Sequence, residues 1–132
     1  MMMNACDGQT KQAVVRPATQ ANRFYTGDAE ELREEVDSFL SIHHGRKQYE
    51  NVAAVIVPHA GYYYSGHVAA TAYMSIDAKK PYKRIFLLGP SHHEWLEWAS
   101  VNTEADYYAT PLGNVKVDHE TAIALTTTEC TR

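Results

Sequence analysis

Between residues 28 and 57 the apolar positions change from a helical period to an unbroken run. Apolar side chains recur three and four residues apart over 32–40, with polar and charged residues between them, as in an amphipathic helix. Asp28 stands three residues before Glu31, so Asp28 can accept a hydrogen bond from a free amide of the first turn while Glu31 reaches back. These features predict a helix that begins after Asp28 and ends near Ile42, ahead of Gly45.

Two short apolar runs, 52–57 and 84–88, flank a second helical pattern. The first run is rich in β-branched residues and stops at a proline, and the second stops at Gly-Pro. Continuous apolarity is typical of a strand that is buried on both faces. Ser65 is placed to cap a helix over 66–76 between the runs. The order strand, helix, strand predicts a βαβ unit with two parallel strands and a right-handed crossover.

The rest of the chain carries weaker patterns. We expect an extended lead-in at 16–25 and two further short strands at 99–101 and 114–117. We also expect a turn-rich stretch at 107–113 and a helix-permissive run at 121–125. Together the elements predict an α/β fold, in which a mainly parallel, βαβ-based sheet is flanked by helices.

The composition fits one globular domain and argues against several classes of partner. The chain has 132 residues, of which 45% are hydrophobic and 21% charged, values that are ordinary for a single domain. Its formal net charge of −4 argues against a nucleic acid held through its phosphates. No apolar run suits a signal peptide or a membrane span, and Cys6 and Cys130 show no disulfide-type spacing. We therefore expect a cytoplasmic protein that binds neither nucleic acid nor membrane.

A histidine follows each of the two expected parallel strands. His59 comes directly after Pro58, and His92 comes two residues after Pro90. Parallel strands bring the loops that follow them to one sheet edge, where open α/β sheets bind ligands. Two imidazole nitrogens that share one ion lie within about 4 Å of each other. The pattern favours a metal site at His59 and His92, although a histidine after a strand is also often a hydrogen-bonded loop residue.

Neighbouring residues are candidates for other roles. His93 can orient His92 or act as acid or base beside the ion. We expect Tyr62, Tyr63 and Ser91 to line a substrate pocket, although tyrosine clusters also pack in interiors. The nearby glycines form neither a dinucleotide fingerprint nor a phosphate-binding loop, and no nucleophile-elbow motif surrounds the serine.

Two segments carry the most specific motifs of the chain. The first reads Val-Pro-His-Ala-Gly-Tyr-Tyr-Tyr-Ser-Gly over 57–66, and the second reads Leu-Gly-Pro-Ser-His-His over 88–93. Together they resemble the Memo family, whose bacterial members are called AmmeMemoRadiSam system protein B. Supporting matches are Arg16, Phe24–Tyr25, Tyr108–Gly113 and Val117–Asp118. One departure is Ala21–Asn22, where the family usually shows Ala-Gly.

The resemblance implies a fold similar to that of the class III extradiol, non-haem iron dioxygenases (the LigB-like fold). It covers about residues 14–120. We accordingly expect a flexible leader at 1–13, the N-terminal part of a Memo-like domain at 14–120 and a poorly defined tail at 121–132. Family chains are considerably longer, so the expected domain is an incomplete, truncated one.

By the same resemblance, His59 and His92 are two of the three ligands of an iron or copper ion. The third ligand of the family is a cysteine, in a part of the family sequence that this chain lacks, and Cys130 does not stand in that motif. The resemblance further implies redox activity and, in animals, a link with signalling to cell motility. It implies no established substrate for the bacterial members.

These observations support two functional hypotheses. The first is a mononuclear metal site that performs redox or dioxygenase-like chemistry, although two imidazoles lack the anionic third ligand of a facial triad. The second is a non-catalytic module that holds a small molecule or peptide ligand in the same cleft. An incomplete domain would also expose apolar surface at an unfinished sheet edge, for which we expect self-association.

Overall fold

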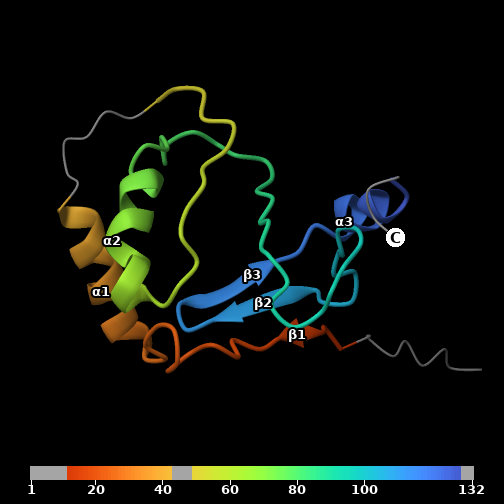
Figure 1. The fold of residues 1–132 in the computed structure, drawn as a ribbon, viewed down its shortest axis with the longest axis horizontal. Coiled ribbons are helices and arrows are strands. Elements are labelled where there is room, and N and C mark those ends of the chain that lie inside the picture. Colours follow the sequence, from red (N-terminus) through yellow and green to blue (C-terminus); the bar gives the residue numbers. More distant parts are fainter. Residues whose placement is uncertain (1–11, 43–48, 129–132) are drawn as a thin grey trace, which may run out of the picture.

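A computed structural model describes residues 12–42 and 49–128, so most of the expected leader lies outside it. The elements are, in order, β1 (Val15–Arg16), α1 (Ala29–Ser41), α2 (Tyr62–Tyr73), β2 (Tyr107–Thr110), β3 (Gly113–Lys116) and α3 (His119–Thr126). Figure 1 shows α1 and α2 side by side at one end of the molecule, α3 at the other end and the sheet between them. Helices around a small sheet confirm the expected α/β class.

Helix α1 forms where the apolar stripe and the cap predict it. Asp28 is the N-cap, and its carboxylate accepts hydrogen bonds from the amides of Glu30 and Glu31 at 2.9 and 3.0 Å. Glu31 reaches back to Thr26, whose hydroxyl donates to the Glu31 carboxylate at 3.0 Å. Ile42 is the C-cap, as expected, and the glycine expected to follow lies outside the described residues.

Helix α2 begins four residues earlier than the sequence predicts. Its N-cap is Gly61, and Ser65, the expected cap, lies inside the helix. The Ser65 residue is 5% exposed, and its hydroxyl donates to the carbonyl oxygen of Ala60 at 2.8 Å. The prediction was wrong because the serine hydroxyl binds a carbonyl of the preceding loop instead of a free amide of the first turn. Ser65 thereby ties that loop to the helix.

The sheet is mixed. Strand β1 pairs in parallel with β2, with Val15 opposite Tyr107, and β2 pairs antiparallel with β3, with Tyr107 opposite Lys116. Strand β3 overlaps the strand expected at 114–117, whereas β2 lies in the stretch expected to be turn-rich. Gly113 opens β3 with a φ of 127°, a backbone conformation that favours glycine at the tight hairpin turn.

The runs 52–57 and 84–88, expected as buried parallel strands, form no strand in the part of the chain that the structure describes. The stretch 99–101 forms none there either. These predictions were wrong because a strand needs a paired backbone and, when fully apolar, cover on both faces. The two runs have neither, since Ile56 is 97% and Leu88 96% exposed. The sheet consequently forms from β1, β2 and β3 and is not mainly parallel.

Helix α3 begins at His119, two residues before the expected tail, and covers the helix-permissive run at 121–125. Asp118 is its N-cap, and the carboxylate accepts a hydrogen bond from the Thr121 amide at 3.0 Å. The guanidinium of Arg84 also donates to this carboxylate. The ion pair therefore joins the second apolar run to the last helix.

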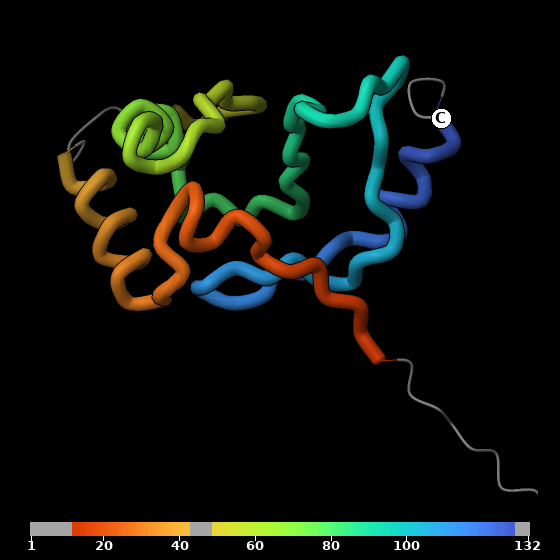
Figure 2. The backbone as a smooth tube through the Cα atoms, turned by 60° about the horizontal axis from the view of Figure 1, so that its bottom comes forward, coloured from red at the N-terminus to blue at the C-terminus, as the bar shows by residue number. Residues whose placement is uncertain are grey.

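Few side chains are buried among the described residues, and apart from Leu32 the buried apolar ones are alanines. Leu32, Ala70, Ala105 and Ala122 are each 8% exposed or less. Figure 2 shows the same arrangement from a second direction, with α1 and α2 at one end and α3 at the other. Within residues 12–42 and 49–128, the helices lack the length and apolar character that crossing a membrane requires.

Candidate functional site

The imidazoles of His59 and His92 meet, although these residues are far apart in the sequence. Their Nε2 atoms are 3.2 Å apart and their ring centroids 5.3 Å apart, with 43° between the ring planes. Pro58 and Pro90 restrict the backbone just before each histidine. The approach that we expected from two parallel strands is thus made by the loops themselves, without a strand ladder.

This pair can act chemically in two ways. Two neutral imidazoles at this distance can share one hydrogen bond, in which one Nε2–H donates to the other Nε2. Two nitrogens that each lie about 2.0–2.1 Å from a common ion are roughly 3 Å apart, so the spacing also suits two ligands of one metal. Among residues 12–42 and 49–128 no group of three or more His, Cys, Asp or Glu side chains is arranged to hold a metal. The described residues therefore bring together two imidazole nitrogens and no third metal-binding side chain.

A large groove adjoins the two histidines. Its volume is about 1300 Å³, and both His59 and His92 line it. The lining comes from four stretches of the chain: the lead-in, the apolar face of α1, the first histidine loop with α2, and the second histidine loop. A pocket of this size exceeds the volume of most small-molecule sites. The histidine pair is consequently accessible to a ligand from the groove.

Close packing of α1 against α2 shapes one wall. Gly66 is buried, and a Cβ atom at this position would lie 2.5 Å from the ring of Phe39. The Phe39 ring is edge-on to Tyr62 and His67, with centroid distances of 6.3 and 4.7 Å. Burial raises the pKa of the Tyr62 hydroxyl, and nearby tyrosines add to the effect. The Tyr62 phenol therefore stays protonated near neutral pH and can donate a hydrogen bond.

The structure brings some of the sequence-predicted residues together and separates others. His93 and Tyr62 line the groove together with the histidine pair. Ser91 is not among the described lining residues of the groove. Its hydroxyl donates to the Glu94 carbonyl oxygen and accepts a hydrogen bond from the Glu94 amide at 3.1 Å. These bonds hold the serine in its own turn. The chemical roles expected of His93, Tyr62 and Ser91 stay predictions.

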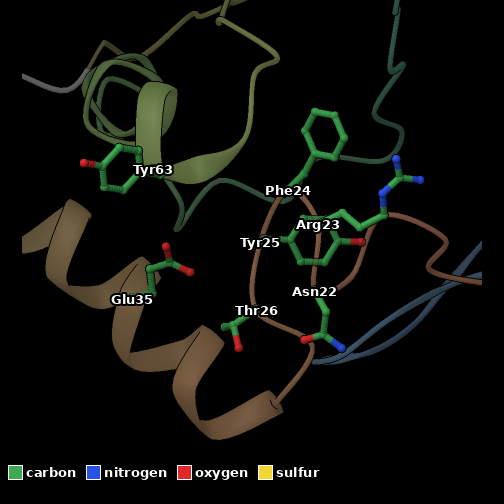
Figure 3. A pocket seen from close by; sticks show the side chains of 7 residues that line it. All are labelled: Asn22, Arg23, Phe24, Tyr25, Thr26, Glu35 and Tyr63. Carbon is green, nitrogen blue, oxygen red and sulfur yellow. The ribbon is translucent and has the colours of Figure 1, made fainter.

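Tyr63 lines a second, smaller cavity of about 360 Å³. Figure 3 shows Tyr63 on α2 and Glu35 on α1 at one side of this cavity, with the loop 22–26 at the other side. Tyr63 is 86% exposed. Consecutive side chains on a helix point about 100° apart, which is why Tyr62 and Tyr63 face different cavities.

Sequence reasoning did not identify Arg16 and Arg23 as groove residues. Both line the groove, and both belong to the segment 16–25, which we expected only to lead into the first helix. Arg16 is the last residue of β1, and Arg23 lies in the loop between β1 and α1. A usable signal was present, because Arg16 is one of the residues that carry the family resemblance.

Comparison with known proteins identifies the family. Residues 16–131 match the sequence profile described as Memo-like protein. The chain is 39% identical to the MEMO1 family protein MHO1 of Saccharomyces cerevisiae over 104 residues, which are 79% of this chain and 31% of the relative. It is 37% identical to Protein MEMO1 of Xenopus tropicalis and 36% identical to that of Homo sapiens, each over 111 residues, 84% of this chain and 36% of the relative.

The chain spans about a third of the length of the curated relatives that it matches. The match nevertheless covers most of this chain, including both histidine motifs. It confirms the resemblance drawn from residues 57–66 and 88–93. This chain belongs to the family of Memo-like proteins.

Proposed function

We propose that this protein binds one iron or copper ion between His59 and His92, and that the ion serves redox or dioxygenase-like chemistry on a small molecule in the adjoining groove. The observation that carries the proposal is the 3.2 Å separation of the two Nε2 atoms at the edge of that groove. Imidazole nitrogen is a common ligand of both metals. The two residues stand in the motifs that carry the family resemblance.

The donor set fits such an ion as a partial site. Two neutral imidazoles leave coordination positions open, which suits a metal that must also bind a substrate or oxygen. The third ligand is a proposal that follows from the family resemblance: a cysteine thiolate from a family motif that neither Cys6 nor Cys130 matches. A thiolate would add the negative charge that the two imidazoles lack.

The residues around the pair would position ligands and protons. The bound metal would supply electron transfer or activation of a bound ligand, and the protein would supply its surroundings. His93 lines the same groove and can accept or donate a proton at its imidazole. The Tyr62 hydroxyl, with its raised pKa, can donate a hydrogen bond to a ligand oxygen.

Metal titration of the purified chain tests the proposal. We expect binding of Fe(II), measured by calorimetry without oxygen, and of Cu(II), with about one ion per chain. His59→Ala and His92→Ala should each weaken binding at least about tenfold, since each removes one of two nitrogen ligands. Far-ultraviolet circular dichroism should be the same for the variants and the parent protein.

A histidine outside the site provides the matched control. His119 lies in α3 and contacts the Asp106 carboxylate at 3.0 Å. His119→Gln removes an imidazole as the other variants do, so metal binding should stay within a factor of two of the parent. Equal affinity of the His59→Ala, His92→Ala and parent proteins for both metals would disprove the metal site.

The size of the groove supports a second candidate function. A cavity of about 1300 Å³ can hold a peptide or small molecule without any metal, with the two histidines acting as hydrogen-bonding groups. This binding module predicts ligand binding that is unchanged by EDTA. Loss of all ligand binding on chelation would count against it and in favour of the metal site.

A further inference from the structure

The charged groups that line the large groove are all cationic. Its described lining contains Arg16 and Arg23 and no Asp, Glu or Lys, although the whole chain carries a formal net charge of −4. The other polar side chains of the described lining are uncharged or imidazole groups: Gln20, Ser65, three tyrosines, His59, His92 and His93. A lining with one sign of charge favours a ligand of the opposite sign.

The two arginines are available to a ligand. Among residues 12–42 and 49–128 the ion pairs join Arg84 to Asp118 and His119 to Asp106, so no described carboxylate neutralises Arg16 or Arg23. The Arg16 guanidinium lies 5.1 Å from the centroid of the Tyr108 ring, a contact that steadies the side chain and leaves its charge in place. Figure 3 shows the Arg23 side chain extending away from Glu35, the acidic residue of the neighbouring cavity.

The remaining lining is largely apolar and aromatic. The rings are those of Phe24, Tyr25, Phe39, Tyr62 and Tyr73. Aromatic walls favour a flat apolar body, because ring contacts add to the burial of apolar area. A guanidinium favours a planar oxyanion, which it can bind through two parallel hydrogen bonds.

We propose that the groove binds a small organic anion in which a carboxylate is attached to an apolar body of about the size of one ring. The carboxylate pairs with Arg16 and Arg23, and the body lies against the aromatic wall. The other end of the molecule faces His59 and His92. This inference deepens the proposed function and rests on it only for the reaction that the bound molecule would undergo.

Three probes separate charge from shape. Benzoate carries both the carboxylate and the ring, benzamide has the same shape without the charge, and acetate has the charge without the ring. With EDTA present, so that metal plays no part, we expect benzoate to bind at least about fivefold more tightly than either other probe, because each lacks one group that the lining recognises. Ligand-observed NMR measures the dissociation constants in the millimolar range.

Substitutions of the arginines test the position of the carboxylate. Arg16→Gln and Arg23→Gln should each weaken benzoate binding about tenfold, as expected for loss of one charged hydrogen-bonding group. Arg23→Lys keeps the charge and should recover part of the affinity. Arg33→Gln, on the exposed part of α1 and outside the groove, is the matched control and should bind benzoate like the parent.

The outcomes distinguish this inference from the metal site. Benzoate binding no tighter than that of benzamide, or unchanged by both Arg16→Gln and Arg23→Gln, would overturn the anion site. Titration of metal in the absence of benzoate should give the parent affinity for both arginine variants. Benzoate binding that persists in a protein that binds no metal would support the anion site and overturn the metal site alone.

Discussion

Asn22 adopts a left-handed backbone conformation, with a φ of 63°. Glycine takes this conformation without a steric penalty, and asparagine is among the few other residues that adopt it readily. The Asn22 side chain also accepts a hydrogen bond from the Gly27 amide at 2.8 Å. Asn22 therefore takes a conformation in which glycine carries no steric penalty, and its side chain adds a contact that closes the loop before α1.

This conformation gives a prediction at the residue scale. Asn22→Ala should lower the free energy of unfolding by about 1–2 kcal/mol, because alanine pays the steric cost of positive φ and loses the bond to Gly27. Asn22→Gly should stay within about 0.5 kcal/mol of the parent, since it relieves the backbone while losing the same bond. Urea denaturation followed by circular dichroism measures both changes.

Another asparagine serves as the control for that comparison. Asn114 is exposed on β3, opposite Ala109, so Asn114→Ala removes the same group from a position that the structure describes as strand. Its effect should lie within about 0.5 kcal/mol of zero, as is usual for exposed positions. If Asn22→Ala destabilised the protein no more than Asn114→Ala, the backbone argument would fail.

At the scale of elements, the contact between α1 and α2 depends on the absence of a side chain at Gly66. A Cβ there would meet the Phe39 ring at 2.5 Å, and that ring also contacts Tyr62 and His67 edge-on. Gly66→Ala should therefore lower the free energy of unfolding by about 1–3 kcal/mol, as for overpacked cores, despite the better helix propensity of alanine. Chemical denaturation measures it.

A second substitution tests the cause of that loss. Phe39→Leu removes Cε2 and Cζ, the two ring atoms nearest to the new Cβ, so Gly66→Ala should cost less in the Phe39→Leu background than in the parent. The difference between the two costs is the coupling energy of the pair, and neighbouring residues show values of about 0.5–3 kcal/mol. A coupling energy of zero would mean that contact with the Phe39 ring does not cause the loss of stability in Gly66→Ala.

The first turn of α3 gives a prediction about pH. Hydrogen bonds from the Thr121 amide, from Arg84 and from the Thr121 hydroxyl lower the pKa of Asp118 from 3.8 to about 2. A carboxyl whose pKa is lower in the folded state than in the unfolded state stabilises the protein at pH values above the unfolded-state pKa. This contribution is lost as the pH falls towards the folded-state pKa of about 2. Asp118→Asn should therefore flatten the dependence of unfolding free energy on pH between about 4 and 2.

The control for this pH effect lies in the same turn. Glu120→Gln also removes a carboxyl from the start of α3. It should leave the slope of unfolding free energy against pH close to that of the parent between pH 4 and 2. Equal slopes for the parent and Asp118→Asn would show that the bonds to Arg84 and Thr121 contribute nothing to acid stability.

Elements set by neighbouring residues could be predicted, and those set by distant ones could not. Helix α1 follows from the cap at Asp28 and a local apolar period, and both lie within a few turns. The runs 52–57 and 84–88 have the composition of strands, but pairing needs a partner backbone that composition does not specify. The pair of β1 with β2 joins Val15 to Tyr107, a contact between segments with no shared sequence signal.

The candidate site could be predicted only in part. His59 and His92 were expected to meet at the edge of two parallel strands; they do meet, but the structure has no such strands, so the reason given for the contact was wrong. The place of Arg23 in the groove could not be predicted, since it depends on how the segment after β1 turns before α1. The directions of Tyr62 and Tyr63 could not be predicted either. Tyr62 lines the groove and Tyr63 the smaller cavity, and the direction of each side chain depends on where the helix begins.

At the scale of the whole molecule, the described chain leaves an unusual amount of apolar surface uncovered. The large aliphatic and indole side chains that are more than three quarters exposed are Ile56, Ile85, Leu87, Leu88 and Trp95. All of them lie in the two apolar runs or just after the second. Contiguous exposed apolar patches mark surfaces that bind another molecule or aggregate. The two runs adjoin the groove along the chain, because Val57 at the end of the first run and the following Pro58 and Pro90 line it.

We therefore expect the chain to self-associate through these runs, because burying one Ile or Leu side chain contributes about 1.5–3 kcal/mol. Sedimentation equilibrium should show a mass that rises with concentration. The double substitution Ile56→Asp with Leu88→Asp places charges on both runs and should weaken association at least about tenfold. Ile123→Asp alters an apolar residue on α3 that is 55% exposed and should leave association unchanged. A monomer mass for the parent at every concentration, or equal association of the double variant and the parent, would mean that these runs do not hold copies of the chain together.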